Sequence, residues 1–487
     1  MAEILLRGGT VLDGTGAEPR PRTDVVLRDD EIVSVRPSTP DGPSGTTGDR
    51  DRGGIAGARG GSTPPEPGAI PPEGDAVVLD STVPGSTGQD RAGTTVIDCR
   101  GLTVMPGLID AHCHITFGEP ASNDELFFHR PPTTSALLAA FNVRKLLLAG
   151  VTGFLDADGI GDLGPGLRDA IAAGIVEGPR MTAGLNALLT AAGGTAGRLI
   201  PDEGSIGYAR VVRDRDEMVR VTREQVKHGA DWIKIHVTGL VPGRAGELSV
   251  WTADELRAVC DTAHDLGTPV VAHCRSAGST RDAAEAGVDL IYHASFMDDA
   301  ALEAVVTSGA ALCPTFTFLA NLCDHGAKVG AGVAQVDIFR GEIEATAAQV
   351  RAAYDAGVRL LCGSESGFSL TPYGHWHARE LEVFVAELGL SPVEAVRCAT
   401  ANGATALRMG GGEIGVVAPG ARADLLVVDG DPARDVTVLQ DRSRLRHVIS
   451  RGRQVDLSAG WPERRPLPGE KVGMWSSQPL TWEVVHP

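Results

Sequence analysis

Short apolar segments alternate with helical patterns from residue 105 to about residue 390, and this alternation limits the possible folds more than any other feature of the chain. Amphipathic patterns over 134–150, 214–229 and 252–267 predict helices between the apolar segments, and a further helix is expected over 391–408. Eight strand–helix units predict an α/β fold of the (β/α)8, or TIM-barrel, type, whose reactive groups lie at the C-terminal ends of the strands. The predicted strands lie near 105–110, 151–156, 181–186, 231–237, 268–273, 288–292, 310–316 and 358–362.

Both ends of the chain carry strand patterns outside this repeat. "TDVVLRDDEIVSVRP" near the start and "GARADLLVVDGDP" near the other end show β-branched runs broken by Gly or Asp. We therefore predict a small β-sandwich domain built from residues 1–104 and 409–487, flanking a barrel of residues 105–408. Residues 38–94 are dense in Gly, Pro, Ser and Asp, and we expect them to form a flexible insertion because they cannot bury enough apolar surface to offset the entropy lost on ordering.

Composition narrows the possible partners and the location. The formal net charge of −19 disfavours nucleic acid and anionic membranes, which attract basic surfaces, so we expect a small-molecule substrate. No run approaches the roughly 18 apolar residues that a membrane span needs. The first residues lack a signal-peptide pattern, and the eight cysteines are scattered without a Cys-x-x-Cys pair, so we expect a cytoplasmic protein with reduced thiols.

Two histidines follow the first predicted strand, in "PGLIDAHCHI". His112 and His114 are one residue apart, so an extended backbone directs both side chains to the same side, about 6–7 Å apart along the chain. Two imidazoles placed in this way can converge on one metal ion. The pair alone fits two ordinary surface histidines equally well.

Further candidates at the ends of other predicted strands favour a metal site over ordinary surface histidines. His273 closes "TPVVAH", His293 closes "DLIYH", and Glu365 follows "RLLCGS". Lys234 lies inside the apolar run of "DWIKIHVTG", where a lysine usually forms an ion pair; among metal ligands, its amine can instead react with carbon dioxide to give a carbamate that bridges two cations. Such a set at one barrel mouth favours a divalent-metal site.

These segments resemble the amidohydrolase superfamily of metal-dependent hydrolases, in particular its imidazolonepropionase-like and Xaa-Pro dipeptidase-like branch. The resemblance rests on "GGTVLDGTG", "VIDCRGLTVMPGLIDAHCH", "GADWIKIHVTG", "VAH", "LSPVEAVRCATANGATAL" and "GVVAPGARADLLVVDGDP". It implies one or two divalent ions, with zinc expected first and manganese, iron or cobalt as alternatives. It also implies a homo-oligomer, because the family often forms dimers or larger assemblies.

The resemblance further implies a role for each candidate ligand. His112 and His114 would bind the more buried metal, and a carbamylated Lys234 would bridge it to a second metal. The second metal would be held by His273 and His293. Glu365 would bind the first metal and take a proton from the bridging water.

Two positions depart from the family pattern. The family usually has Gly-Thr-Asp after the eighth strand, whereas this chain has Ser364 and Glu365 after Gly363, and the extra methylene extends the carboxylate by about 1.5 Å. Related proteins often carry Gly-Gly-His after the third strand, and Thr195 stands at the histidine position here. Substrate identity is therefore not implied by the resemblance.

The residues favour hydrolysis of an amide or cyclic amide, with ester or lactone hydrolysis as a neighbouring reaction. Glu365 leaves a lyase, decarboxylase or isomerase reaction open. A hydrolytic deaminase ranks lower because related deaminases carry Glu at the position of Ser276. The candidates for substrate contact are His236, Arg275 and Tyr208.

A second His-x-His pair, His375 and His377, lies after the eighth predicted strand. We expect it to lie in a loop, without partner ligands.

Overall fold

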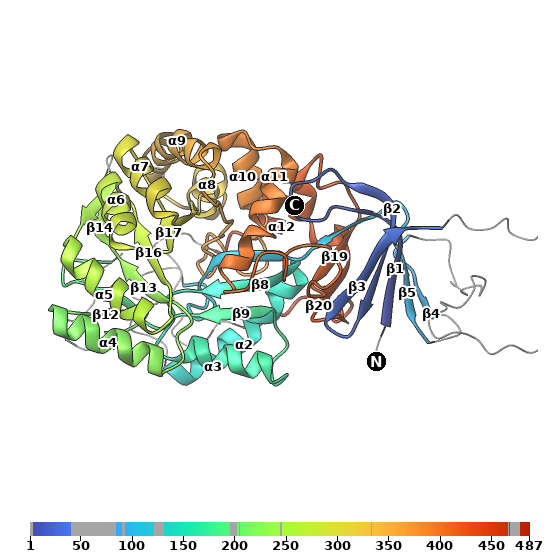
Figure 1. Ribbon diagram of the computed structural model, residues 1–487, viewed down its shortest axis with the longest axis horizontal. Coiled ribbons are helices and arrows are strands. Elements are labelled where there is room, and N and C mark those ends of the chain that lie inside the picture. The colour runs from blue at the N-terminus through green and yellow to red at the C-terminus, as the bar shows by residue number, and fades with distance from the viewer. Residues whose placement is uncertain are drawn as a thin grey trace, which may run out of the picture.

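The protein is described here by a computed structural model, in which a body of parallel strands and helices lies beside a β-sheet (Figure 1). The structure describes residues 3–39, 84–89, 93–120, 131–194, 202–203, 205–243, 246–332, 334–465, 467 and 478–487. None of the helices in these ranges is long and apolar enough to cross a membrane.

Strands from both ends of the sequence form one nine-stranded sheet. Its main order is β21-β20-β19-β6-β1-β2-β3, and β5 pairs with β1 and β4. In the middle, β6 pairs antiparallel with β19, so that Met105 lies opposite Leu426. The bounds are β1 (Glu3–Val11), β2 (Arg20–Arg28), β3 (Glu31–Pro37), β4 (Thr87–Gln89), β5 (Thr95–Asp98), β6 (Thr103–Pro106), β19 (Leu425–Val428), β20 (Leu445–Ser450) and β21 (Arg453–Gln454).

This sheet has a hydrophobic cluster of its own. Leu6, Val25, Ile97, Leu425 and Ile449 are among its buried members. Both ends of the chain thus contribute to one sheet, as the strand patterns predicted. Most of the expected insertion lies outside the described residues, but β4 falls within it and pairs with β5, so that part is an ordered strand.

The larger body contains parallel strands in two sheets. One sheet has the order β7-β8-β9, and the other has the order β11-β12-β10-β13-β16-β17-β18. The bounds are β7 (Leu108–Cys113), β8 (Val151–Asp156), β9 (Arg180–Ala183), β10 (Ala187–Leu189), β11 (Ser205–Ile206), β12 (Ala209–Val211), β13 (Ile233–His236), β16 (Val270–Cys274), β17 (Leu290–His293) and β18 (Ala311–Cys313), with a separate hairpin of β14 (Thr238–Gly243) and β15 (Gly246–Ser249).

Residues 358–362, predicted as the eighth strand, connect the two sheets. The backbone N–H of Leu361 donates to the carbonyl of Leu312 at 2.8 Å, and that of Ala111 donates to Cys362 at 2.9 Å. These bonds place the residues that follow Cys362 next to the end of β7. The loops that follow β7 and residues 358–362 therefore lie next to each other, although they are far apart in the sequence.

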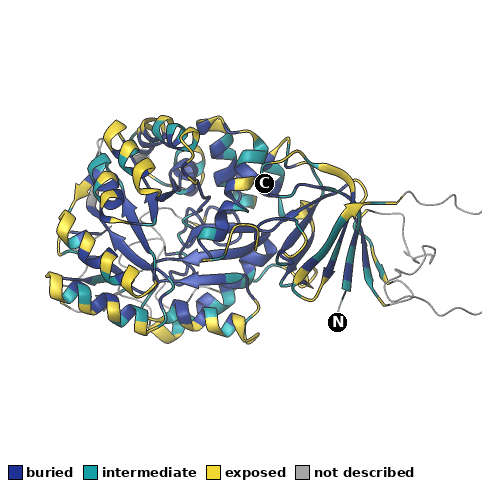
Figure 2. Ribbon diagram, viewed as in Figure 1, coloured by how far each residue is buried: buried dark blue, intermediate teal, exposed yellow. Residues whose placement is uncertain are grey.

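Helices cover the outside of the strands, with their exposed residues turned away from the buried strands (Figure 2). The helices predicted over 134–150, 214–229 and 252–267 are present close to those limits as α2, α4 and α5. The bounds are α2 (Pro132–Leu148), α3 (Leu163–Ala172), α4 (Arg215–Lys227), α5 (Ala253–Asp265), α6 (Ala277–Ala286), α7 (Asp299–Ser308), α8 (Thr317–His325), η2 (Gly326–Val329), α9 (Ala334–Asp355), α10 (Arg379–Leu388), α11 (Pro392–Cys398), η3 (Asn402–Thr405), η4 (Val436–Leu439), η5 (Arg442–Arg444) and α12 (Trp482–Val485).

The helix expected over 391–408 was predicted too long. It ends at Cys398, and only the short η3 follows. The Asn402 side chain donates to the carbonyl of Leu360 at 2.8 Å, and Gly403 packs so closely on Ile109 that a Cβ there would lie 2.6 Å from the Ile109 Cβ. Tertiary packing of Asn402 and Gly403 therefore prevents α11 from continuing through these residues, and glycine also has a poor helix propensity.

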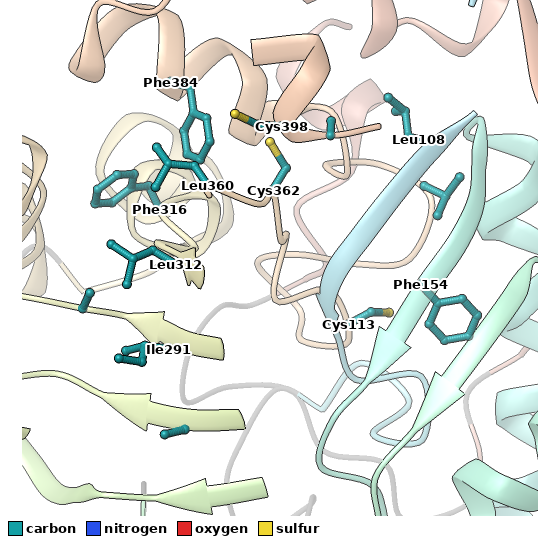
Figure 3. Packing of buried hydrophobic residues seen from close by; sticks show 14 of the residues in the cluster. Leu108, Cys113, Phe154, Ile291, Leu312, Phe316, Leu360, Cys362, Phe384 and Cys398 are labelled. Atoms are coloured by element: carbon teal, nitrogen blue, oxygen red, sulfur yellow. The ribbon is translucent and has the colours of Figure 1, made fainter. Parts of the chain in front are cut away.

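The main hydrophobic core lies between the strands and the helices. Figure 3 shows part of it, including Leu312 of β18, Leu360 and Phe384 of α10. All eight cysteines are free, and seven of them are buried, as expected for thiols packed as small apolar groups.

Candidate metal centre

Four of the predicted histidine ligands lie close together and are buried. His112 lies within β7, which extends further than predicted, and His114 follows its end. The ring centroid of His112 is 4.9 Å from that of His114 and 5.4 Å from that of His293. His273 completes the group, with its centroid 4.5 Å from that of His293. The strands therefore bring together histidines that were each predicted from their position at the C-terminal end of a strand.

Two overlapping sets of side chains have the geometry to hold a cation. His112, His293 and Glu365 form one set, and His112, His114 and Asp158 form the other. Within each set, the ligand atoms lie within 4.8 Å of one another. Imidazole and carboxylate groups are ligands for zinc and other divalent transition metals.

The buried polar atoms also fit a cation. Nε2 of His293 has no hydrogen-bond partner among the described residues. A buried polar atom without a partner is costly unless a ligand, water or ion satisfies it. The pKa of His293 lies well below its usual value because of burial and the nearby His273, so its ring is neutral and able to bind a metal.

Thr315 holds the ring of His112 in place. The Thr315 hydroxyl lies 3.1 Å from the carbonyl of Cys313 and forms a hydrogen bond of 3.0 Å with Nδ1 of His112. Nε2 of His112 is the ring nitrogen left out of this hydrogen bond. The ring stacks on Tyr292 with 3.7 Å between centroids. Such outer contacts orient metal ligands in proteins.

Lys234 lies in β13 and is buried beside these rings. Its Nζ is 3.7 Å from Oδ1 of Asp158 and 4.1 Å from the centroid of Tyr292. Burial lowers the pKa of Lys234, although Asp158 acts in the opposite direction. A lower pKa increases the fraction of neutral amine, which is the form that reacts with carbon dioxide.

Asp158, just beyond β8, was missed from the sequence. Its Oδ1 lies 3.1 Å from Nδ1 of His114, and its Oδ2 accepts from Nε2 of His236 at 3.1 Å. Burial alone would raise the pKa of Asp158, but Lys234 and His114 lower it well below its usual value, so the group is ionised. Its position could have indicated it, because in "FLDADG" it lies directly after the second predicted strand, where reactive groups are expected.

Glu365 lies in the loop after the eighth predicted strand, in an uncommon backbone conformation. Its φ is +53°, and its N–H donates to the carbonyl of His112 at 2.7 Å. Burial raises the pKa of Glu365 to about 7. Left-handed backbone at a residue other than glycine is costly and is held by its surroundings. The longer side chain is thus combined with a specific backbone geometry that keeps the carboxylate within reach of His112 and His293.

Comparisons with known proteins show the family of the chain. The model of the amidohydrolase family matches residues 103–455. The chain belongs to the amidohydrolase family. It is 26% identical to ochratoxinase of Aspergillus niger over 397 residues, which cover 76% of this chain and 77% of that protein. It is also 25% identical to imidazolonepropionase of Cutibacterium acnes over 362 residues, or 70% of this chain and 80% of that one.

Solved structures of the family are similar over nearly the whole chain. The crystal structure of a putative prolidase from Bifidobacterium longum matches with a TM-score of 0.70 and 26% identity, covering 96% of this chain and 97% of that one. Family and structural neighbours imply an α/β TIM-barrel fold. The resemblance inferred from the sequence motifs is thereby confirmed.

In this amidohydrolase, two contacts distinguish His273 from the other histidines. Its Nε2 donates to Oε2 of Glu247 on β15 at 3.0 Å, and its ring stacks on His236 at 4.5 Å. His273 therefore belongs to neither of the two sets described above. The hydroxyl of Thr238 also donates to Glu247, at 2.7 Å. Burial alone would raise the pKa of Glu247, but the contacts with His273 and Arg275 lower it to about 2.

The three candidates for substrate contact have protein partners in the structure. His236 is bound to Asp158, and Tyr208 is buried with its ring centroid 5.3 Å from that of His236. Arg275 is held between Glu247 and Glu342. Their contact with substrate stays a prediction. Thr195, the family departure in the third loop, lies outside the described residues.

The second His-x-His pair lies in a loop, as expected, and His377 takes part in a hydrogen-bond network. Gly374 N–H donates to Nε2 of His377 at 2.9 Å, so Nδ1–H of His377 donates to Asp110 on β7, at 2.6 Å. Asp110 also accepts from the Ser364 hydroxyl at 2.5 Å and from the Ser364 N–H at 3.0 Å. This buried network fixes the residue before Glu365 to the strand that carries His112.

The last described segment, residues 478–487, packs on the same loop. The N–H of Leu480 donates to the carbonyl of Ser369 at 2.8 Å, and the indole N–H of Trp376 donates to the carbonyl of Leu480 at 2.6 Å. The N–H of Trp482 donates to Nδ1 of His375 at 3.2 Å. These bonds link the end of the chain to the loop that follows Glu365.

Proposed function

We propose that the protein is a metal-dependent hydrolase that cleaves an amide or cyclic-amide C–N bond in a small molecule or dipeptide-like substrate. The observation that carries this proposal is the convergence of His112, His114, His293, Asp158 and Glu365 in two overlapping sets whose ligand atoms lie within 4.8 Å of one another. Relatives that act as hydrolases on such bonds support the same reaction class.

The residues divide the work in the following way. His112, His114 and Glu365 would hold one divalent ion, and His273, His293 and a carbamylated Lys234 would hold a second; zinc is the first candidate, with manganese, iron and cobalt as alternatives. When bound, a divalent ion supplies Lewis acidity at the scissile carbonyl and makes water at the site more acidic. Glu365 would accept the proton of the attacking water and deliver it to the leaving nitrogen.

The position of Glu365 favours hydrolysis over a lyase, decarboxylase or isomerase reaction. The extra methylene had raised the possibility that its carboxylate lies outside the site. In the structure, a carboxylate oxygen of Glu365 lies within 4.8 Å of ligand atoms of His112 and His293, so the longer side chain still reaches the site and can serve as the base of a hydrolase.

We also propose the division of the chain into residues 105–408 as the barrel and residues 1–104 and 409–487 as a β-sandwich. The shared sheet supports a separate terminal domain. Its second layer, a homo-oligomeric state and a cytoplasmic location are part of the same proposal.

The test is the bound-metal content by elemental mass spectrometry, followed by a panel of N-acyl amino acids, dipeptides and cyclic amides. We expect about two divalent ions per chain and metal-dependent release of an amine. One ion per chain would overturn the bridging role of Lys234. The absence of both bound metal and metal-restored activity would overturn the whole proposal. Release of ammonia from amino-heterocycles alone would assign a deaminase instead.

A further inference from the structure

One carboxylate on a helix outside the strands binds the turns that follow two candidate ligands. Arg275 and Ser295 each lie two residues after a histidine, His273 and His293 respectively. Glu342 on α9 accepts from both: from Nε of Arg275 at 3.0 Å and from a terminal nitrogen of Arg275 at 2.5 Å, and from the Ser295 hydroxyl at 2.6 Å. Glu342 is buried, with 2% of its surface exposed.

The turn after β17 needs such an anchor. His293, Ala294 and Phe296 all have φ between +49° and +68°, a region that side chains other than glycine rarely adopt. Such a conformation is costly and persists only where the surroundings hold it. The N–H of Phe296 donates to the hydroxyl of Thr346 at 3.1 Å. Thr346 is four residues after Glu342, so both anchors lie on the same face of α9.

The turn after β16 is connected to the same carboxylate through Arg275. A terminal nitrogen of Arg275 lies 3.4 Å from Oε1 of Glu247, and Glu247 accepts from His273 at 3.0 Å. Both carboxylates are buried and the Arg275 side chain is 12% exposed, and charged hydrogen bonds are shorter and stronger than neutral ones. Glu342 therefore reaches His273 through two intermediate side chains, and it reaches His293 through Ser295.

We propose that Glu342 is a positioning residue for the half of the centre formed by His273 and His293. Glu342 fixes the separation of the two turns that follow His273 and His293. It has no direct role toward His112 and His114, which lie on and after β7; there Thr315 and the hydrogen bonds of Asp110 hold the structure. This inference rests on the proposed function, because it assigns Glu342 to one of the two cation positions proposed there.

The experiment compares Glu342→Gln and Glu342→Asp with Glu344→Gln, a matched control at an exposed position of the same helix. Metal-free protein is titrated with zinc against a chromophoric chelator, and bound zinc is counted after gel filtration. We expect two classes of zinc site in the wild type. Glu342→Gln should weaken one class by about 10- to 100-fold and leave the other unchanged. Glu342→Asp should give a smaller loss, and Glu344→Gln should match the wild type.

Equal weakening of both classes in Glu342→Gln, or no change in either, would overturn the inference. Ser295→Ala provides a second variant in case Glu342→Gln does not fold, because it leaves the ion pair of Arg275 intact. It should weaken the same class of site, and an effect on the other class would contradict the assignment. A wild type without any zinc site would instead overturn the proposed function, so the two failures are distinguishable.

Discussion

The hydroxyl of Thr315 forms a hydrogen bond of 3.0 Å with Nδ1 of His112, so that Nε2 is the nitrogen of this buried ring left out of the contact. This contact joins the turn after β18 to the strand that carries the first histidine pair. It therefore couples the orientation of His112 to a residue that is itself held in a left-handed conformation, with a φ of +58°.

Thr315→Val should weaken metal binding. The substitution keeps the shape but removes the hydroxyl that binds Nδ1 of His112, and loss of such an outer contact typically costs about 10- to 100-fold in metal affinity. Chelator competition measures the loss directly. Thr307→Val, at an exposed threonine on α7, is the control and should bind metal like the wild type. An unchanged affinity in Thr315→Val would show that other contacts orient His112.

Glu365→Gln should lower kcat by about 100- to 10,000-fold, the range expected when a general base is lost. Glu365→Asp restores the residue that the family usually carries but shortens the side chain in a backbone shaped for Glu. Its kcat should therefore lie between those of the wild type and Glu365→Gln. Steady-state kinetics with the best amide substrate provides the measurement. A kcat in Glu365→Asp that is equal to or above that of the wild type would mean that the loop does not depend on the longer side chain.

Lys234 should carry a carbamate in the metal-loaded protein. Protein reconstituted with zinc in 13C-bicarbonate should show one carbamate resonance by 13C NMR, and Lys234→Met should lack it. The buried position and lowered pKa of Lys234 favour the neutral amine that this reaction needs. If the wild type shows no resonance but binds two ions, the bridge between them must be a different group.

Glu380 should make stability depend on pH. It accepts hydrogen bonds from the backbone of Phe316 and Thr317 at 2.9 and 2.8 Å, and burial raises its pKa to about 7 from a usual 4.5. The folded protein therefore holds this proton more tightly than the unfolded chain does. The resulting stabilisation is complete below pH 4.5, is lost as the pH rises through about 7, and amounts to about 3 kcal/mol.

The measurement is the free energy of unfolding of wild type and Glu380→Gln between about pH 5 and about pH 8, since the variant cannot titrate at this position. Taking the difference between the two proteins removes the contribution of all other groups. The advantage of the wild type should shrink as the pH rises. A difference that stays constant over this range would contradict the raised pKa.

Leu480→Ala should destabilise the loop that follows Glu365. The side chain is fully buried, and a Leu→Ala change in a core costs about 2–5 kcal/mol. We expect a lower free energy of unfolding and a lower kcat with unchanged metal content, because the histidines of the proposed metal centre lie on other segments. Leu137→Ala, at a side chain that is 74% exposed on α2, should change stability little. Loss of bound metal in Leu480→Ala would show that the end of the chain supports the whole centre.

The candidate histidines could be predicted because each follows from a local pattern. An apolar strand that ends on His273 or His293 is visible in a few residues, and the fold brings such ends together. Their supports could not be predicted in the same way. Asp110 and His377 are 267 positions apart, and although His377 stands in a second His-x-His pair, no local pattern indicates that it binds Asp110.

The same limit applies to Glu342 and to the end of α11. Glu342 lies in a long helix with other acids, and only packing shows that it faces Arg275 and Ser295 rather than solvent. The sequence after Cys398 is compatible with a longer helix, but tertiary contacts such as the close approach of Gly403 to Ile109 prevent it. Periodicity thus predicts elements, whereas tertiary contacts decide where they stop and which polar side chains they bury.

The pairing of Met105 with Leu426 has a consequence for how the protein is made. Roughly 300 residues separate the two strands, so at about 5–20 residues per second a ribosome needs about 15 to 60 seconds after completing β6 before it has synthesised β19. Throughout that interval, the backbone donors and acceptors on one side of β6 lack their final partner, and unpaired strand edges promote aggregation. The free edge of β6 is therefore a site where the nascent chain can aggregate until β19 emerges and covers it.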